Sequence, residues 1–433
     1  MTEDEGSPTS LSIRKGRSLR WTALAATAVA LVSLAGGIAR ADTTLTIESW
    51  RNDDADIWNN KILPAFMAKH PDIKVTFKGY PPTEYNAALN TEIAGGIAAD
   101  IITCRPFDAS LDLYKKGELL KLNDIPSMKN FSDVAKAAWS TDDGKDTFCM
   151  PMASVIHGFI YNKKIFDELH LTPPKTVAEF HQVLDKIKQD GKYTPIALGT
   201  ADQWEAATMG FQNIGPDYWK GEEGRKALIA GKEKYTDPQY VAVWKELASW
   251  APYMGDGYQA QKNADTQNLF SLGRAAIYPA GSWDIPLFEQ SKDLSIDAFP
   301  PPQPDGTSKC YISDHVDIGM GVNAKSKNVD AAKTFIDWVG SAEFAGLYAN
   351  ALPGFFPLTH EPVEIKDPVA QTFVGWRKNC ESTIRNSYQI LSRGTPNLEN
   401  ELWAVSANVL NGTQTPEAAA QQIQKGLDSW YKP

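Results

Sequence analysis

The chain has 433 residues, of which 42% are hydrophobic and 22% charged, proportions typical of a globular domain and not of a disordered chain, a collagen or a coiled coil. Its 43 Lys and Arg residues against 53 Asp and Glu residues give a net charge of -10, the wrong sign for following a phosphate backbone. We therefore expect no nucleic-acid partner. At about 150 residues per domain, the length predicts two or three domains.

Residues 1–41 have the pattern of a secretory signal peptide. Four basic residues between positions 14 and 20 precede an apolar run over residues 21–38, and Ala39-Arg40-Ala41 supplies a small-x-small cleavage pattern. A transmembrane anchor is the alternative, since the run approaches the length of a bilayer span, but it contains two Thr, one Ser and two adjacent Gly. The first Cys is Cys104, which excludes a lipid anchor at the cleavage site. We expect export to a bacterial periplasm after cleavage behind Ala41.

Strand and helix patterns alternate after the predicted signal peptide. The first set comprises a strand at residues 45–50, a helix face over 57–66, a strand at 73–77, a helix at 85–94 and a strand at 100–104. This β-α-β-α-β order predicts an α/β fold with a parallel, doubly wound sheet.

A second set of patterns follows the same logic. It has a strand at residues 148–156, a helix over 177–187 that stops at Gly191, and a strand at 194–198. Residues 203–273 are mostly helical by period, a short strand at 275–279 follows, and the prolines at 300–302 and 304 mark a linker. The C-terminal part predicts a strand at 315–322 and helices near 330–339, 369–378, 398–410 and 416–430.

The four cysteines can pair in three ways in an exported protein, and their spacing does not choose among them. Cys104 ends one strand pattern and Cys149 begins another, so a disulfide can join neighbouring strands. Cys310 and Cys380 can form the second. Buried free thiols are the alternative, because free Cys is among the most buried residue types.

Motifs for catalysis or metal binding are missing from the sequence. There is no GxxxxGK[ST], HExxH or GxSxG, the six His have no zinc-ligand spacing, and the acidic cluster 52–56 lacks the Gly and Glu of a calcium loop. Residues 319–324 fit a loose dinucleotide pattern but lie inside a strand pattern. We therefore expect no cofactor, no metal and no catalytic residues. A secreted glycoside hydrolase is the alternative from another class, since it needs only two carboxylates across a cleft.

Aromatic residues stand out: the chain has 13 Trp, 15 Tyr and 17 Phe. Three Trp lie beside polar residues in turn-like segments, namely Trp50-Arg51-Asn52-Asp53, Asp202-Gln203-Trp204-Glu205 and Gly281-Ser282-Trp283-Asp284. The apolar C–H face of a sugar stacks on an aromatic ring, and its hydroxyls need planar carboxylates, amides or guanidinium groups. These segments therefore suit a sugar site, with ordinary core packing as the alternative for each Trp.

Four segments in order resemble family 1 extracellular solute-binding proteins of carbohydrate ABC transporters, which have the maltose-binding-protein fold. They are Phe-Cys-Met-Pro at 148–151 leading to Tyr-Asn-Lys-Lys-Ile-Phe at 161–166, Pro-Pro-Lys-Thr-Val-Ala-Glu-Phe at 173–180, Gly-Arg-Ala-Ala-Ile at 273–277 leading to Gly-Ser-Trp at 281–283, and Gly-Val-Asn-Ala-Lys-Ser-Lys at 321–327 leading to Ala-Ala-Lys-Thr-Phe at 331–335. Trp50-Arg51, Glu84-Tyr85-Asn86 and Ser313-Asp314-His315-Val316 look most like members that bind raffinose-type or other α-linked oligosaccharides.

The resemblance implies a two-lobed periplasmic-binding-protein fold of type II, with doubly wound sheets and helices on both faces. The lobes would be residues 42–153 plus 313–379 and residues 154–312 plus 380–433, joined by crossings near 153–158, 309–312 and 380–384. Such a protein captures sugar between its lobes by hinge closure. It then delivers the sugar to the membrane permease of an ABC importer, and we expect a monomer. The crossings lie beside Cys310 and Cys380, which favours pairing of these two.

The resemblance also implies a set of binding residues. It makes Trp283 the stacking residue, with Trp204 as a second platform; the remaining assignments are the loop residues Trp50, Arg51 and Asp53, the acidic ligand Asp108, the hinge residues Asp314 and His315, and Phe355 at the rim. Val155 stands where some maltodextrin binders carry a sugar-contacting Glu, so His157 is the expected substitute, with a core His as the alternative. A monosaccharide, a sugar acid or a polyol are the alternative ligands.

Overall fold

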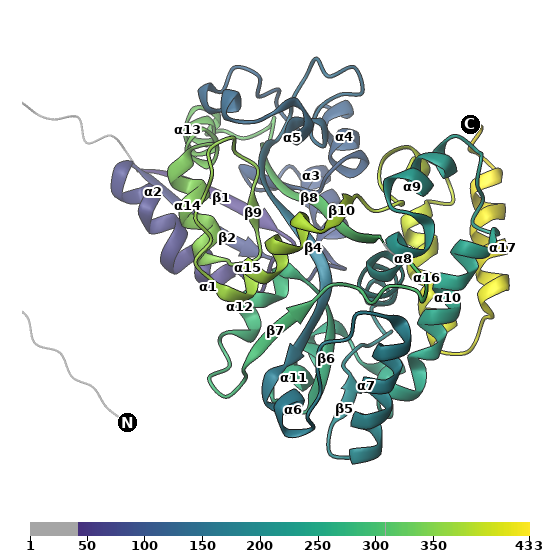
Figure 1. The fold of residues 1–433 in the computed structure, drawn as a ribbon. Helices are drawn as coiled ribbons and strands as arrows, with labels where there is room; N and C mark the ends of the chain where they lie inside the picture. Colours follow the sequence, from purple (N-terminus) through teal and green to yellow (C-terminus); the bar gives the residue numbers. More distant parts are fainter. Residues whose placement is uncertain (1–41, 308) are drawn as a thin grey trace, which may run out of the picture. The chain divides into compact units, whose positions relative to one another are not determined.

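Two long strands organise the fold of the computed structural model, which describes residues 42–307 and 309–433 (Figure 1). The predicted signal peptide lies outside these residues. Strands β4 (Met150–Asn162) and β8 (Cys310–Val322) have 13 residues each and pair antiparallel. Every residue of β4 is buried, as expected of a strand that is covered on both faces.

The first group of strands forms the parallel part of the sheet. Strand β1 (Thr43–Ser49) pairs parallel with β2 (Ile73–Gly79) and with β3 (Ile101–Cys104). The helices α2 (Leu63–Lys69) and α3 (Tyr85–Gly95) connect them. This β-α-β-α-β unit is the one that the sequence predicts. Strand β8 then pairs antiparallel with β3, so the whole sheet is mixed and not entirely parallel.

Both long strands change partners midway. Residues 150–156 of β4 pair with β8, and residues 157–162 pair with β6 (Ala275–Gly281) and β7 (Ile296–Phe299). The first four residues of β8 pair with β10 (Cys380–Thr383), and the rest pair with β3 and β4. Strand β5 (Thr194–Ile196) completes the order β2-β1-β3-β8-β4-β6-β5, and β9 (Phe356–Pro357) pairs with β4.

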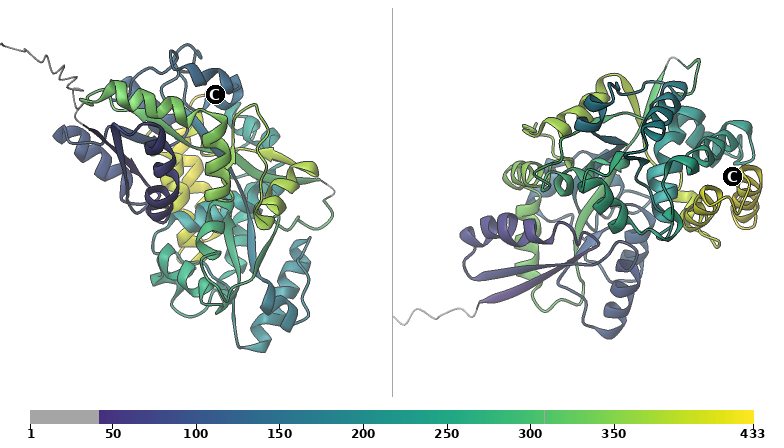
Figure 2. Two further views of the ribbon diagram at one scale, coloured as in Figure 1. Left: turned by 90° about the vertical axis from the view of Figure 1, so that its left-hand side faces the viewer. Right: turned by 90° about the horizontal axis from the view of Figure 1, so that it is seen from below.

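Helices account for most of the remaining chain, and their ends follow local sequence signals. A capping box of Thr176 and Glu179 begins α7 (Val177–Asp190), and Gly191 with a φ of 75° ends it. Figure 2 shows α16 (Leu398–Leu410) and α17 (Pro416–Asp428), which pack against each other and against α10 (Pro238–Ser249). The other α-helices of the described residues are α1 (Ala55–Ile57), α4 (Asp108–Lys115), α5 (Asp133–Ala137), α6 (Lys163–Glu168), α8 (Gln212–Trp219), α9 (Glu222–Ile229), α11 (Asn263–Ser271), α12 (Ile285–Phe288), α13 (Val329–Val339), α14 (Ala342–Ala351) and α15 (Pro368–Gly375).

Two disulfides join neighbouring strands and segments. Cys104 at the end of β3 bonds to Cys149 just before β4, and Cys310 of β8 bonds to Cys380, its register partner on β10. All four cysteines are therefore oxidised, as in proteins of oxidising compartments. The pairing is the one expected above, and the alternative of free thiols is wrong.

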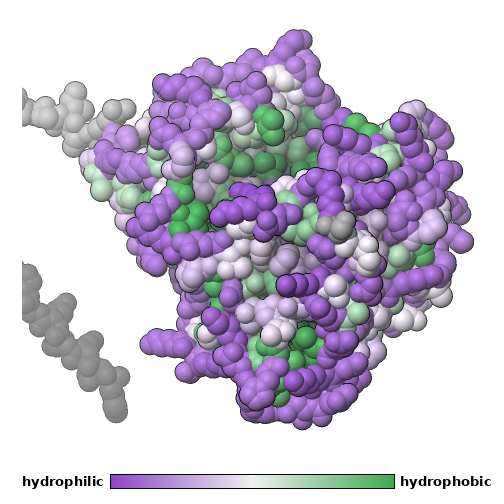
Figure 3. All heavy atoms as spheres, viewed as in Figure 1, coloured by the Kyte–Doolittle hydropathy of each residue, from purple (hydrophilic) through white to green (hydrophobic). Residues whose placement is uncertain are grey.

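Hydrophilic residues cover most of the face seen in Figure 1, with hydrophobic residues confined to separate patches (Figure 3). Within residues 42–307 and 309–433, none of the helices combines the length and the apolar character that a membrane span needs.

Candidate ligand-binding site

A cavity of about 540 Å³ gathers residues from distant parts of the chain. Its wall includes the loop after β1, the start of α4, the turn after β6, and a segment between residues 385 and 403. A π-helical segment, Ala206–Phe211, adds Thr208 to the wall, and such segments are frequent at functional sites. The volume lies in the range of small-molecule sites.

Trp50, Trp204 and Trp283 all line this cavity, as does Trp403, which the sequence did not single out. The guanidinium of Arg105 lies 4.5 Å from the centre of the Trp50 ring. Trp50 is therefore already covered on one face, and its ring holds Arg105 in place by a cation–π contact. Trp204, Trp283 and Trp403 are the Trp rings left for a ligand.

Arg51 lines the cavity but is engaged by its own neighbours. Its Nε and Nη2 donate to Asp54 at 2.6 and 2.9 Å, and Nη2 lies 2.9 Å from Asp53. Nη2 also donates to the carbonyl oxygen of Trp283 at 3.3 Å. Burial raises the pKa of Asp54 to about 6 despite this pairing. Arg51 thus positions Trp283, and Asp53 acts through Arg51 because it does not line the cavity.

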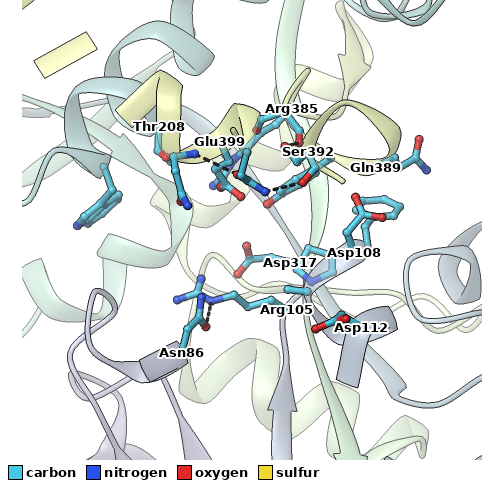
Figure 4. A pocket seen from close by; sticks show the side chains of 18 of the residues that line it. Asn86, Arg105, Asp108, Asp112, Thr208, Asp317, Arg385, Gln389, Ser392 and Glu399 are labelled. Carbon is cyan, nitrogen blue, oxygen red and sulfur yellow. Dashed lines mark hydrogen bonds and ion pairs between the residues drawn. The ribbon is translucent and has the colours of Figure 1, made fainter. Parts of the chain in front are cut away.

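Four charged side chains of the cavity, which the sequence did not single out, have no ionic partner closer than 3.8 Å in the part of the chain that the structure describes. They are Arg105, Asp317, Arg385 and Glu399. Arg105 donates to Asn86 at 3.2 Å and to the carbonyl oxygen of Pro82 at 3.0 Å. Figure 4 shows Arg385 and Glu399 on one side, Arg105 with Asn86 on the other, and Asp317 between them. Glu399 has one weak ion pair, 3.8 Å from Arg385.

Burial shifts the pKa of three of these groups. It raises the pKa of Asp317 and of Glu399, and it lowers the pKa of Arg105. Such groups gain from any ligand that replaces the lost water with hydrogen bonds. One sequence feature could have identified Arg105, because it directly follows a parallel strand and ligands bind beyond the carboxyl ends of such strands.

The carboxylate of Asp108 lines the cavity, but one of its oxygens already accepts a hydrogen bond from Arg393. It is the first residue of α4, where a carboxylate is favoured by the helix dipole. Arg393 donates from Nε to Asp108 at 2.6 Å and from Nη2 to Asp142 at 2.8 Å. Burial raises the pKa of Asp108, and Arg393 opposes that rise.

His157 and His315 lie behind the cavity and do not line it. They are almost fully buried, and their Nε2 atoms are 3.0 Å apart. The Nδ1 atoms contact the carbonyl oxygens of Thr208 and Val316 at 3.1 and 2.9 Å. Burial is the largest cause that lowers both pKa values, so both rings stay neutral. His157 is therefore a core residue, the alternative given above, and its ring edge supports Trp283 at 5.1 Å between centroids.

Two further expected residues lie outside the cavity. Asp314 accepts two hydrogen bonds from Arg377, at 2.7 and 2.8 Å, and one from Ser382 at 2.6 Å. The expected rim position of Phe355 is wrong, because its side chain is fully buried and lies 5.2 Å from the Arg51 guanidinium.

Two buried carboxyl groups support the cavity wall from behind. Glu205, next to Trp204, accepts from Asn263 and Thr266 at 3.1 and 3.0 Å, and burial raises its pKa to about 8. Asp284, next to Trp283, has a pKa raised by burial to about 7. Among the residues that the structure describes, no cluster of His, Cys, Asp and Glu could hold a metal ion.

An α/β fold with a polar, aromatic cavity between distant segments suits the binding of a small solute. Residues 61–371 match the family of bacterial extracellular solute-binding proteins, and the chain belongs to that family.

Two related sequences and one solved structure each match more than half of the chain. An ABC transporter extracellular-binding protein of Pyrococcus horikoshii is 27% identical over 60% of this chain, and the match spans 61% of that protein, less than two thirds of its length. The multiple sugar-binding protein of Streptococcus mutans is 22% identical over 74% of this chain and 76% of its own. The solved structure of RafE in complex with raffinose has 20% identity and a TM-score of 0.73, covering 89% of this chain and 99% of its own. This chain therefore has the same fold as the solved structure of RafE.

Proposed function

We propose that this protein is a periplasmic receptor that captures a sugar and delivers it to the membrane permease of an ABC importer. The observation that carries the proposal is the cavity itself. It joins three Trp rings, those of Trp204, Trp283 and Trp403, with four charged side chains that have no ionic partner closer than 3.8 Å among the described residues. Aromatic faces suit the C–H face of a sugar, and charged planar groups suit its hydroxyls. The named S. mutans relative, a sugar-binding protein, supports the same class.

The charges of the cavity favour an uncharged sugar over a sugar acid. Ion pairs of 2.5 to 2.8 Å engage Arg51, Arg393, Asp108 and Asp112, and the exposed Lys115 lies 3.9 Å from Asp142. Of the other four charged groups, the guanidinium groups of Arg105 and Arg385 and the carboxyl groups of Asp317 and Glu399 balance each other. An anionic ligand that pairs with one guanidinium would also face a carboxylate, whereas a hydroxyl can accept from the first and donate to the second. We infer a neutral ligand, with α-linked oligosaccharides as the class that the Trp50-Arg51 segment favours.

The strand pairing suits the two lobes expected from the sequence, residues 42–153 plus 313–379 and residues 154–312 plus 380–433. Strand β4 changes partners between residues 156 and 157, and β8 changes partners after residue 313. A chain that moves from one set of strands to another can bend at the change with little loss of hydrogen bonds. We therefore place the hinge at these two points and beside β10.

A thermal-shift screen tests the proposal. At 100 times its dissociation constant, a ligand adds about 2.7 kcal/mol to the free energy of unfolding. The panel contains raffinose, stachyose, maltotriose, galactose, mannitol and trigalacturonate. We expect neutral oligosaccharides to raise the melting temperature and to be recovered intact. No shift with any sugar would reject the receptor, a shift only with trigalacturonate would reject the neutral ligand, and cleavage products would favour the glycoside hydrolase.

A further inference from the structure

A second cavity of about 490 Å³ adjoins the first. The two share five residues in their walls: Phe107, Asp108, Leu111, Gln389 and Arg393. Two of these residues have a strained backbone, since Phe107 has a φ of 61° and Gln389 a φ of 63°, a region that residues other than Gly rarely adopt. Backbone strain of this kind concentrates at ligand-binding sites.

Arg393 closes the junction between the two cavities. Its guanidinium bridges Asp108, which lines both cavities, and Asp142, which lines only the second. About a third of the Arg393 side chain is exposed. An ion pair this exposed to water contributes little stability, so the long side chain can leave its position when a ligand contacts it.

The wall of the second cavity is polar with one aromatic ring. Ser140, Thr141 and Thr147 present hydroxyl groups, and Phe107 supplies the ring. Ser140 donates to the carbonyl oxygen of Lys136 at 2.9 Å and contacts the Thr147 hydroxyl at 2.9 Å, and Thr141 donates to Asp143 at 2.6 Å. Their protons are therefore used within the protein, and lone pairs remain on the oxygens as acceptors for a ligand. This composition suits a hydroxyl-rich ligand and not a lipid or an apolar peptide.

We propose that the second cavity is an extension site that takes the outer residues of an oligosaccharide whose other end fills the first cavity, with Arg393 as the movable partition between them. The inference rests on the proposed function and adds that the ligand is long enough to reach from the first cavity into the second. An oligosaccharide that outgrows the first cavity would have to displace Arg393 to continue along the shared wall. Receptor affinity then depends on chain length through residues that a short sugar never contacts.

The test is calorimetric titration of three sugar series with two to five residues each: α-galactosides from melibiose to verbascose, malto-oligosaccharides and xylo-oligosaccharides. Ala137→Trp fills the second cavity, because Ala137 is exposed and lines only that cavity. Val134→Trp is the matched control, since Val134 lies on the same helix, is 83% exposed and does not line the cavity. Melting curves verify that both variants fold.

We expect the affinity of the unmodified protein to rise by about fivefold or more at one step of the series that binds. Ala137→Trp should abolish that step and leave shorter sugars unaffected, and Val134→Trp should preserve it. Arg393→Gln should raise the ratio of long-chain to short-chain affinity, because no ion pair then has to break. Equal loss for all lengths, or no loss for any, in Ala137→Trp would overturn the extension site while the receptor stands. If no series binds, the proposed function and the extension site both fail.

Discussion

Arg51 and Trp283 are 232 positions apart in the sequence, yet the Arg51 guanidinium donates a hydrogen bond to the Trp283 carbonyl oxygen at 3.3 Å. Arg51 is itself held by Asp53 and Asp54. The loop after β1 therefore fixes the turn that presents the aromatic ring to the cavity. The site is accordingly assembled by buried polar contacts as well as by packing.

Replacing Trp283 by Ala should weaken sugar binding by about 2 kcal/mol, or about 30-fold in the dissociation constant, as for a central aromatic contact. Trp283 is 8% exposed and lines the cavity, so part of its ring faces the ligand. Calorimetric titration measures the effect. Trp283→Phe, which retains an aromatic face, should recover most of the affinity. Unchanged binding in Trp283→Ala would remove Trp283 from the site.

Replacing Arg393 by Gln should weaken binding of a short sugar by about 0.5 to 1 kcal/mol at low salt, the range for partly exposed ion pairs. Arg393 joins residues of the two proposed lobes, and its pairs would form fully only in the closed state. Salt screens such pairs, so the difference from the unmodified protein should vanish in 1 M NaCl. Lys192→Gln is the control, because Lys192 pairs with Glu168 on the surface and neither residue lines a cavity. A salt-independent loss would contradict the ionic explanation.

Glu205 should make the protein less stable as the pH rises. Its folded pKa of about 8 lies above the ordinary value of 4.5 for a Glu side chain, so the folded state holds its proton more tightly than the unfolded state. The resulting stabilisation is complete below pH 4.5 and is lost as the pH rises to 8, by up to about 1.4 kcal/mol per pH unit. Asp284, with a folded pKa of about 7, acts in the same direction.

Glu205→Gln removes this titration and keeps the oxygen that accepts from Asn263 and Thr266. Urea unfolding at pH values from 4.5 to 9 should show the variant gaining stability over the unmodified protein as the pH rises. The exposed Glu361→Gln is the control and should follow the unmodified protein. Parallel stability curves for Glu205→Gln would contradict the raised pKa.

Ligand should close the proposed lobes. Trp283 and Arg385 on one lobe and Arg105 and Asp317 on the other line one cavity, so all of their contacts to a sugar exist together only in the closed form. Binding shifts the population toward the form that makes more contacts. Small-angle scattering should show a smaller radius of gyration with saturating sugar, and Trp283→Ala at the same sugar concentration should show a smaller change. An identical radius with calorimetrically verified sugar would contradict hinge motion.

The parallel unit β1-α2-β2-α3-β3 could be predicted from the sequence because each element carries its own hydrophobic period. Helix α7 was equally clear, since its apolar residues follow a helical period and Gly191 marks its end. Strands β7, β9 and β10 were not predicted. They have four residues or fewer, and each of them pairs with one of the long strands β4 and β8. They exist because these long strands offer them an edge.

The residues of the candidate site also fall into two groups, those that the sequence reveals and those that only the structure reveals. Trp50, Trp204 and Trp283 could be found from the sequence, because each stands next to polar residues in a turn. Arg105, Asp317, Arg385 and Glu399 could not be found together, since a charged residue in a sequence carries no sign of whether a counterion will neutralise it. That depends on neighbours up to almost 300 positions away. Local chemistry therefore determined the elements and the aromatic candidates, while the tertiary structure decided which charges remain without partners, because burial and Coulomb interactions depend on distance in space.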